Sequence, residues 1–131
     1  MNLKTGLSIE KTITVKPEQT AFHVGSGDLR VFATPEMVWL LESVCTELLA
    51  DYLDAGETSV GVVVNVRHLA PTPVGMRVTV SAELTEIDGN LISFQVSLHD
   101  ELEKIGEAKH TRAVIDADRF LKRVESKRGI S

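Results

Sequence analysis

The sequence contains a single cysteine, Cys45, and no long stretch of apolar residues. A lone cysteine cannot form a disulfide within its own chain, which is typical of proteins from a reducing compartment. The N-terminus lacks the apolar core of a signal peptide, and no segment has the length and apolarity of a membrane span. We therefore expect a cytoplasmic protein with no membrane partner.

The sequence also lacks a long basic run, and its net charge is −5. Proteins that bind nucleic acid usually present a basic face, so we expect no nucleic-acid partner. His23, His99 and His110 do not have the spacing of metal ligands, so we expect no metal site. Glycine loops that cradle phosphates and dinucleotide fingerprints are missing too, which predicts no bound cofactor.

The remaining composition is that of an ordinary globular chain. It has 131 residues, of which 43% are hydrophobic and 25% charged. This length fits one domain, and neither an internal repeat nor a linker interrupts it. We expect a single domain over residues 1–131.

Apolar periodicity predicts one strand and one long helix in the first half of the chain. Apolar and polar residues alternate from Leu7 to Val15, which indicates a strand that ends before Pro17. A helix is predicted over Pro35–Leu53, with Thr34 as its N-cap and Gly56 as its stop. Its apolar stripe is wide, which favours a helix wrapped by a sheet.

The second half of the chain predicts strands joined by short connections. The apolar period switches to two after the helix, and Asp88-Gly89 is a tight-turn signal. A short polar helix follows at Asp118–Arg128. The order predicts an α+β fold, with one central helix and a meandering antiparallel sheet. The four predicted strands lie near Val60–Val66, Met76–Leu84, Ile92–Leu98 and Ile105–Ile115.

Three polar residues are candidates for catalysis, and each also has a structural interpretation. His68 follows the valine-rich strand, shares a face with Val60, Val62, Val64 and Val66, and is placed for proton transfer or for a structural hydrogen bond. Glu42 lies among apolar residues of the helix, as a shielded base or as part of its polar stripe. Thr34 is a helix cap or a catalytic hydroxyl at a helix N-terminus.

The spacing of these residues limits how they can act together. Thr34 and Glu42 are eight residues apart, which corresponds to roughly 12 Å along a helix axis. Both can line one elongated groove, but they cannot form a tight pair by themselves.

Three segments add a family resemblance: VFATPEMVWLLE, SVGVVVNVRHLAPTPVGMRVTVSAEL and IGEAKHTRAVID. Through them the chain, from about Gly6 to about Asp116, resembles the fluoroacetyl-CoA thioesterase-like branch of the hotdog thioesterase superfamily. The run HLAPTPVG, from His68 to Gly75, is the most specific part. The resemblance implies a hotdog fold, in which an antiparallel sheet wraps a long helix.

The resemblance also implies an activity and a site. The activity is hydrolysis of a small acyl-CoA thioester to the free acid and CoA, with CoA as part of the substrate. The sites lie at the interface of homodimers joined at their sheet edges, and the chain is expected to form a homodimer or a dimer of dimers. Thr34, Glu42 and His68 match the catalytic set, and Gly61 matches a glycine that leaves room for the acyl group.

The remaining predictions concern the contacts for CoA and a candidate lid. Arg67, Arg77 and Arg112 are candidate surface contacts for the phosphates of CoA. The fluoroacetyl-CoA enzyme has an aromatic lid ahead of the helix, whereas this chain has the candidate lid Gly25–Asp28, of sequence GSGD. A different acyl group is therefore expected.

Three other functions compete with hydrolysis. An acyl-CoA hydratase of the same fold would need an Asp and His signature that the sequence lacks. A non-catalytic module that binds acyl-CoA or a similar metabolite is the main alternative, and a purely structural dimer is the third. The residues do not decide between attack by water and a covalent acyl-enzyme.

Overall fold

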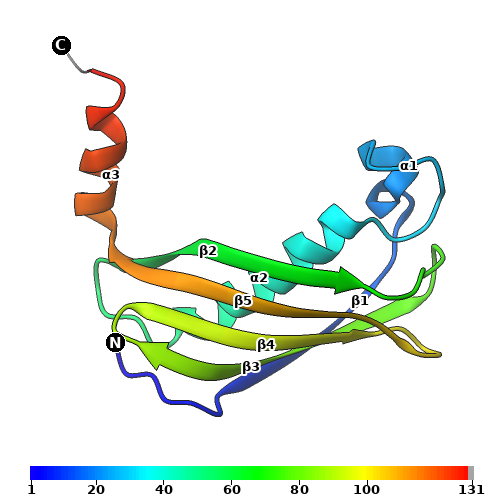
Figure 1. The fold of residues 1–131 in the computed structure, drawn as a ribbon, viewed down its shortest axis with the longest axis horizontal. Helices are drawn as coiled ribbons and strands as arrows, with labels where there is room; N and C mark the ends of the chain where they lie inside the picture. Colours follow the sequence, from blue (N-terminus) through cyan, green and yellow to red (C-terminus); the bar gives the residue numbers. More distant parts are fainter. Residues whose placement is uncertain (130–131) are drawn as a thin grey trace.

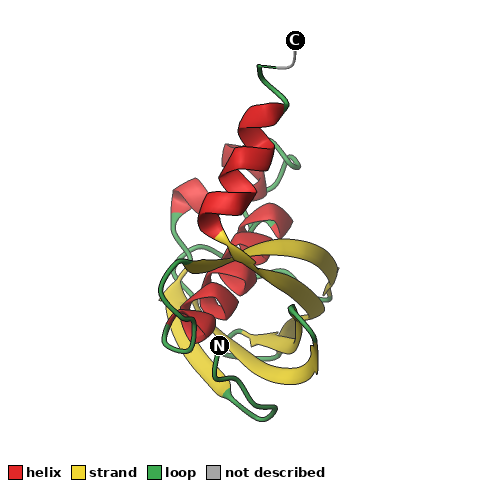
Figure 2. Ribbon diagram, turned by 90° about the vertical axis from the view of Figure 1, so that its left-hand side faces the viewer, coloured by secondary structure: helices red, strands yellow, loops and turns green. Residues whose placement is uncertain are grey.

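An antiparallel sheet curves around one long helix in the computed structural model, which describes residues 1–129. The helix lies against the concave side of the sheet (Figures 1 and 2). This arrangement confirms the predicted α+β class. The elements in chain order are β1 (Ser8–Thr14), η1 (Pro17–Gln19), α1 (Ala21–Val24), α2 (Thr34–Ala50), β2 (Glu57–His68), β3 (Arg77–Asp88), β4 (Leu91–His99), β5 (Lys104–Asp116) and α3 (Ala117–Ser126).

The core lies between α2 and the inner face of the sheet. The strand order is β1-β3-β4-β5-β2, and every neighbouring pair is antiparallel. Alternate residues of β3 and β4 point inward and are buried, as the period of two predicts. Helix α2 contributes seven buried residues at helical spacing: Met37, Leu40, Leu41, Val44, Cys45, Leu48 and Leu49.

The ends of α2 differ from those predicted. Ala33 is the N-cap, no side chain caps the helix, and Thr34 is the first helical residue. The prediction that Thr34 caps the helix is therefore wrong, because its hydroxyl binds His68 instead. The helix ends at Ala50, before the predicted Leu53, and Gly56 has a φ of 85° in the turn before β2.

Strand β2 contains a bulge that changes which of its residues face the helix. Gly61 pairs with Arg112 and Val63 pairs with Thr111, so Val62 is an extra residue between them. Gly61 therefore faces inward, on the same side as the residues from Val64 to His68 that pair with buried positions of β5. The prediction that His68 shares a face with Val60 and Val62 is wrong, because it assumed an uninterrupted alternation.

The two edges of the sheet have different surfaces. Edge strand β1 carries Glu10 and Lys11, and such charges discourage pairing with another sheet. Edge strand β2 instead exposes three consecutive valines, Val62 (54%), Val63 (48%) and Val64 (37%). An apolar edge of this kind is a template for pairing with another strand.

Two further features concern Cys45 and the C-terminal helix. Cys45 is fully buried in the core, and burial raises the pKa of its thiol to about 12. Helix α3 projects away from the sheet (Figure 1) and has no buried residue. Within residues 1–129, no helix has the length and apolarity that crossing a bilayer requires.

Candidate active site

Thr34 and His68 form a hydrogen-bonded pair where α2 begins and β2 ends. Thr34 Oγ1 lies 2.7 Å from His68 Nδ1. Backbone contacts join the segments on either side, because Phe32 N–H donates to the carbonyl of Thr72 at 2.9 Å and Val31 forms an isolated bridge with Pro73. The loop before α2 and the loop after β2 thus hold the pair together.

The environment of His68 favours a neutral ring. Burial lowers the pKa of His68 below its usual 6.5, and the backbone of Ala70 opposes this effect. A neutral imidazole has one nitrogen free to accept a proton. Since Nδ1 faces the Thr34 hydroxyl, the pair has the geometry of a nucleophile and its general base.

A surface pocket of about 370 Å³ opens beside this pair. Ser26 lines the pocket, so the Gly25–Asp28 turn borders it. Neither nearby phenylalanine forms an open aromatic wall: Phe32 lines the pocket but is only 1% exposed, and Phe22 does not line it and has the guanidinium carbon of Arg30 4.2 Å from its ring centroid. The remaining lining consists of Ala21, Val31, Phe32, Leu69, Ala70 and Pro71.

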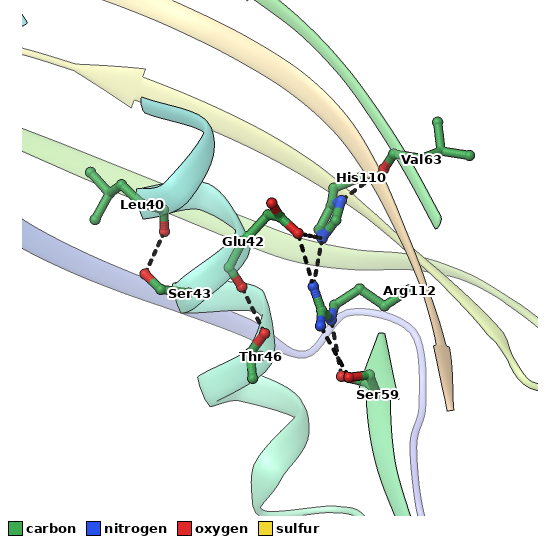
Figure 3. A network of polar contacts seen from close by, with 8 residues as sticks. All are labelled: Leu40, Glu42, Ser43, Thr46, Ser59, Val63, His110 and Arg112. Atoms are coloured by element: carbon green, nitrogen blue, oxygen red, sulfur yellow. Dashed lines mark hydrogen bonds and ion pairs between the residues drawn. The ribbon is translucent and has the colours of Figure 1, made fainter. Parts of the chain in front are cut away.

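Glu42 belongs to a second polar cluster, shown in Figure 3. Arg112 Nη1 donates to Glu42 Oε2 at 3.3 Å. The other guanidinium nitrogens of Arg112 donate to the hydroxyl and carbonyl of Ser59, at 2.9 and 3.2 Å. The Glu42 side chain is 37% exposed and that of Arg112 is 8% exposed. The carboxylate therefore reaches solvent while the guanidinium that holds it is buried.

Gly61 leaves room for this carboxylate. A Cβ placed on Gly61 would lie 2.7 Å from Glu42 Oε2, closer than real contacts allow. The glycine expected beside the acyl group therefore lies directly against Glu42.

The two clusters are separate in the chain. Thr34 and His68 contact each other, whereas Glu42 contacts Arg112 and His110, and no hydrogen bond or ion pair joins the clusters among residues 1–129. This separation agrees with the spacing of roughly 12 Å that eight helical residues impose.

The three candidate arginines lie in different settings. Arg67 is exposed, next to His68 and on the opposite face of β2. Arg77 is exposed and bonded to Glu101 at 3.1 Å. The expectation that Arg112 lies at the surface is wrong, because β5 turns it inward onto Ser59 and Glu42.

Sequence reasoning missed His110 as part of this cluster. His110 was considered only as a metal ligand, yet it is fully buried beside Arg112 and Glu42. Its position two residues before Arg112 on a strand is the signal that could have placed it there. In the described part of the chain, no group of three or more His, Cys, Asp or Glu residues is arranged to hold a metal ion.

A family model and a known relative point to the same family. The family of fluoroacetyl-CoA-specific thioesterases matches residues 15–118. The fluoroacetyl-CoA thioesterase of Streptantibioticus cattleyicolor is 45% identical over 135 residues, which cover 95% of this chain and 97% of that protein.

Two solved structures illustrate the likeness in three dimensions. A mutant of the fluoroacetyl-CoA-specific thioesterase in complex with fluoroacetate and CoA has a TM-score of 0.85 and 38% identity, covering 90% of this chain and 99% of that one. A hot-dog-like protein from Thermanaerovibrio acidaminovorans has a TM-score of 0.91 at 24% identity, covering 97% of this chain and 94% of that one, and shares the fold.

Proposed function

Because the chain belongs to the fluoroacetyl-CoA-specific thioesterase family and has the hotdog fold, we propose that it hydrolyses a small acyl-CoA thioester to the free acid and CoA. The chain is a thioester hydrolase. The observation that supports its site best is the 2.7 Å contact between Thr34 Oγ1 and His68 Nδ1 beside a pocket. In this proposal residues 1–131 form one domain, CoA enters only as part of the substrate, and the single cysteine supports a cytoplasmic location.

The thioester carbonyl would lie at the N-terminus of α2. Backbone N–H groups of the first helical turn have no partner within the helix and stabilise negative charge on the carbonyl oxygen. His68 takes the proton of Thr34, whose Oγ1 attacks the carbonyl carbon and forms an ester. The C–S bond breaks, and the CoA thiolate leaves with the proton from His68.

Glu42 would serve the second half of the reaction. Its carboxylate, held by Arg112, accepts a proton from the water that attacks the Thr34 ester. The bond between Thr34 Oγ1 and the acyl carbon breaks, the proton taken by Glu42 returns to Oγ1, and the free acid leaves. The direct contact of Thr34 with His68 supports this covalent route over direct attack by water.

We place this site at the interface of a homodimer joined through β2. The exposed valines of this edge support such pairing, whereas the charged β1 edge does not. A two-fold axis through Val63 would set Asn65 opposite the partner subunit's Gly61. Asn65 is three residues from His68, so the partner subunit's Gly61 would lie about 10 Å along the strand from His68. The Gly61 of the same chain is seven residues away, or about 23 Å along the strand.

In this proposal each site is shared by two subunits. Thr34 and His68 come from one chain, and Gly61 and Glu42 come from its partner. The arrangement explains why the two polar clusters do not meet within one chain. Pairing of two dimers is compatible with the same interface.

The substrate's two ends would meet different surfaces. Arg67, exposed beside His68, is the preferred contact for a CoA phosphate, and Arg77 is a second because only Glu101 holds it. The acyl group would reach the pocket bordered by Ser26 and Ala21. Because these side chains are small, the proposal favours an acyl group other than fluoroacetyl.

Thiol release from a panel of short, branched, aromatic and long acyl-CoAs tests the proposal. We expect release that favours one acyl class and disappears in His68→Ala, with the same unfolding temperature in both proteins. Binding of acyl-CoA without release, at high protein concentration, would favour the non-catalytic module instead.

A further inference from the structure

His110 is a buried imidazole that the proposed mechanism does not use. It lies on β5, is 0% exposed, and stacks on Phe94 with 6.4 Å between ring centroids. Buried polar groups need hydrogen-bond partners, and both ring nitrogens have one. Nδ1 lies 2.7 Å from the carbonyl oxygen of Val63, and Nε2 lies 3.2 Å from Arg112 Nη1.

These partners fix where the proton of the ring lies. The Val63 carbonyl only accepts, so Nδ1 carries the hydrogen and donates it. The guanidinium of Arg112 only donates, so Nε2 has no hydrogen and accepts. The ring is therefore neutral, in agreement with its pKa, which burial lowers most and Arg112 lowers further, against the opposing effects of the Val63 carbonyl and Glu42.

Through Arg112 the ring is connected to Glu42. The same atom, Arg112 Nη1, donates to His110 Nε2 and to Glu42 Oε2, at 3.2 and 3.3 Å. Ser59 holds the other guanidinium nitrogens, and His110 is itself tied to Val63, where β2 has its bulge. A rigid frame thus sets the direction of the carboxylate.

We propose that His110 is a positioning residue for the thioesterase reaction: it donates to the Val63 carbonyl at the bulge of β2 and accepts from Arg112, which holds the carboxylate of Glu42 against Gly61. The proposal rests on the hydrolase function proposed above. His110 does not touch substrate. It fixes the direction of Glu42 and so acts on turnover rather than on substrate binding.

Two variants separate the two hydrogen bonds of the ring. His110→Gln places an oxygen near the position of Nε2, so it keeps an acceptor for Arg112 and loses the donor at the Nδ1 position. His110→Asn places its amide near the position of Nδ1, so it keeps the donor to Val63 and loses the acceptor for Arg112. The two variants are therefore matched controls for each other.

Kinetics of the two variants test the proposal. We expect His110→Asn to lose kcat on the order of tenfold to a hundredfold with an unchanged KM, as misplacement of a catalytic group does. His110→Gln should keep kcat within a few-fold of the native protein. Equal losses in both, no loss in either, or a loss confined to KM would overturn the proposal.

A spectroscopic measurement keeps the test independent of activity. Nitrogen NMR of His110 in the unaltered protein should show the neutral form with its hydrogen on Nδ1 at neutral pH. A hydrogen on Nε2, or a protonated ring, would refute the assignment whether or not the variants fold. If the native protein hydrolyses no acyl-CoA, the proposed function fails. The NMR result still shows whether His110 donates to Val63 and accepts from Arg112.

Discussion

The hydroxyl of Thr34 contacts a ring nitrogen of His68 rather than a backbone amide of α2. At the residue scale, this contact means that Thr34 can serve the reaction without also stabilising the start of the helix. A cap contributes to helix stability, whereas a hydroxyl bound to a histidine contributes to chemistry. Substitutions at this position should therefore change turnover without changing the fold.

Thr34→Ala should lower kcat on the order of a hundredfold or more, because the proposed nucleophile is lost. The free energy of unfolding should change by less than about 0.5 kcal/mol, because no cap is removed. Urea unfolding beside steady-state kinetics measures both effects. A stability loss of about 1 kcal/mol would instead show that the hydrogen bond to His68 contributes to the fold as well as to chemistry.

The lowered pKa values of His68 and His110 predict how the stability of the enzyme changes at acid pH. Both rings take up a proton in the unfolded chain near 6.5, and in the folded chain only at lower pH. Stability contributed by the two rings is present above pH 6.5 and decreases as pH falls from there toward the folded pKa values.

The acid limb of kcat/KM should therefore lie below pH 6.5, because His68 must be neutral to act as a base. A pH–rate profile locates the limb. Unfolding by urea at several pH values should show less acid loss of stability in His110→Gln than in the native protein. A limb above pH 6.5 would contradict the burial of His68.

At the scale of elements, β2 combines three features in one strand. It ends in His68, carries a bulge at Gly61–Val63, and forms an apolar edge of the sheet. The bulge turns Gly61 toward Glu42, and the neighbouring valines remain exposed at the edge of the sheet. One strand thus links the proposed chemistry to the proposed subunit contact.

Gly61→Ala tests the link between β2 and Glu42. The added methyl group would lie 2.7 Å from Glu42 Oε2, so the carboxylate must shift from the position in which Arg112 holds it. We expect kcat to fall on the order of tenfold or more, with a small effect on stability because the end of a flexible side chain can shift. Val60→Ala, also on β2, is the control that should leave kcat unchanged.

At the scale of the whole molecule, local patterns were enough for the architecture but not for the site. The periods of Met76–Leu84 and of α2 predicted strand, helix and core, because both depend on neighbours in sequence. The bulge at Gly61 and the inward turn of Arg112 depend on pairing between β2 and β5, which distant residues determine. His110 was missed for the same reason.

Mixed dimers test the two-subunit site. Thr34→Ala and Glu42→Gln homodimers should both be nearly inactive. After mixing by unfolding and refolding, hybrids would carry one intact site if Thr34 and Glu42 come from different subunits. About half of random pairs are hybrids, so about a quarter of the native activity should return.

The control is the same mixture kept folded, so that subunits do not exchange. If Thr34 and Glu42 of one chain act together, every site in the hybrid lacks one residue and mixing restores nothing. That result would refute the shared site.

The burial of Cys45 has a practical consequence for reagents that change colour on reacting with free thiols. Its pKa of about 12 and its place in the core keep it unreactive in the folded chain, so such a reagent detects released CoA alone. In denaturant the single cysteine of each chain becomes reactive. The protein therefore carries its own reporter of unfolding, read by the same reagent that reads turnover.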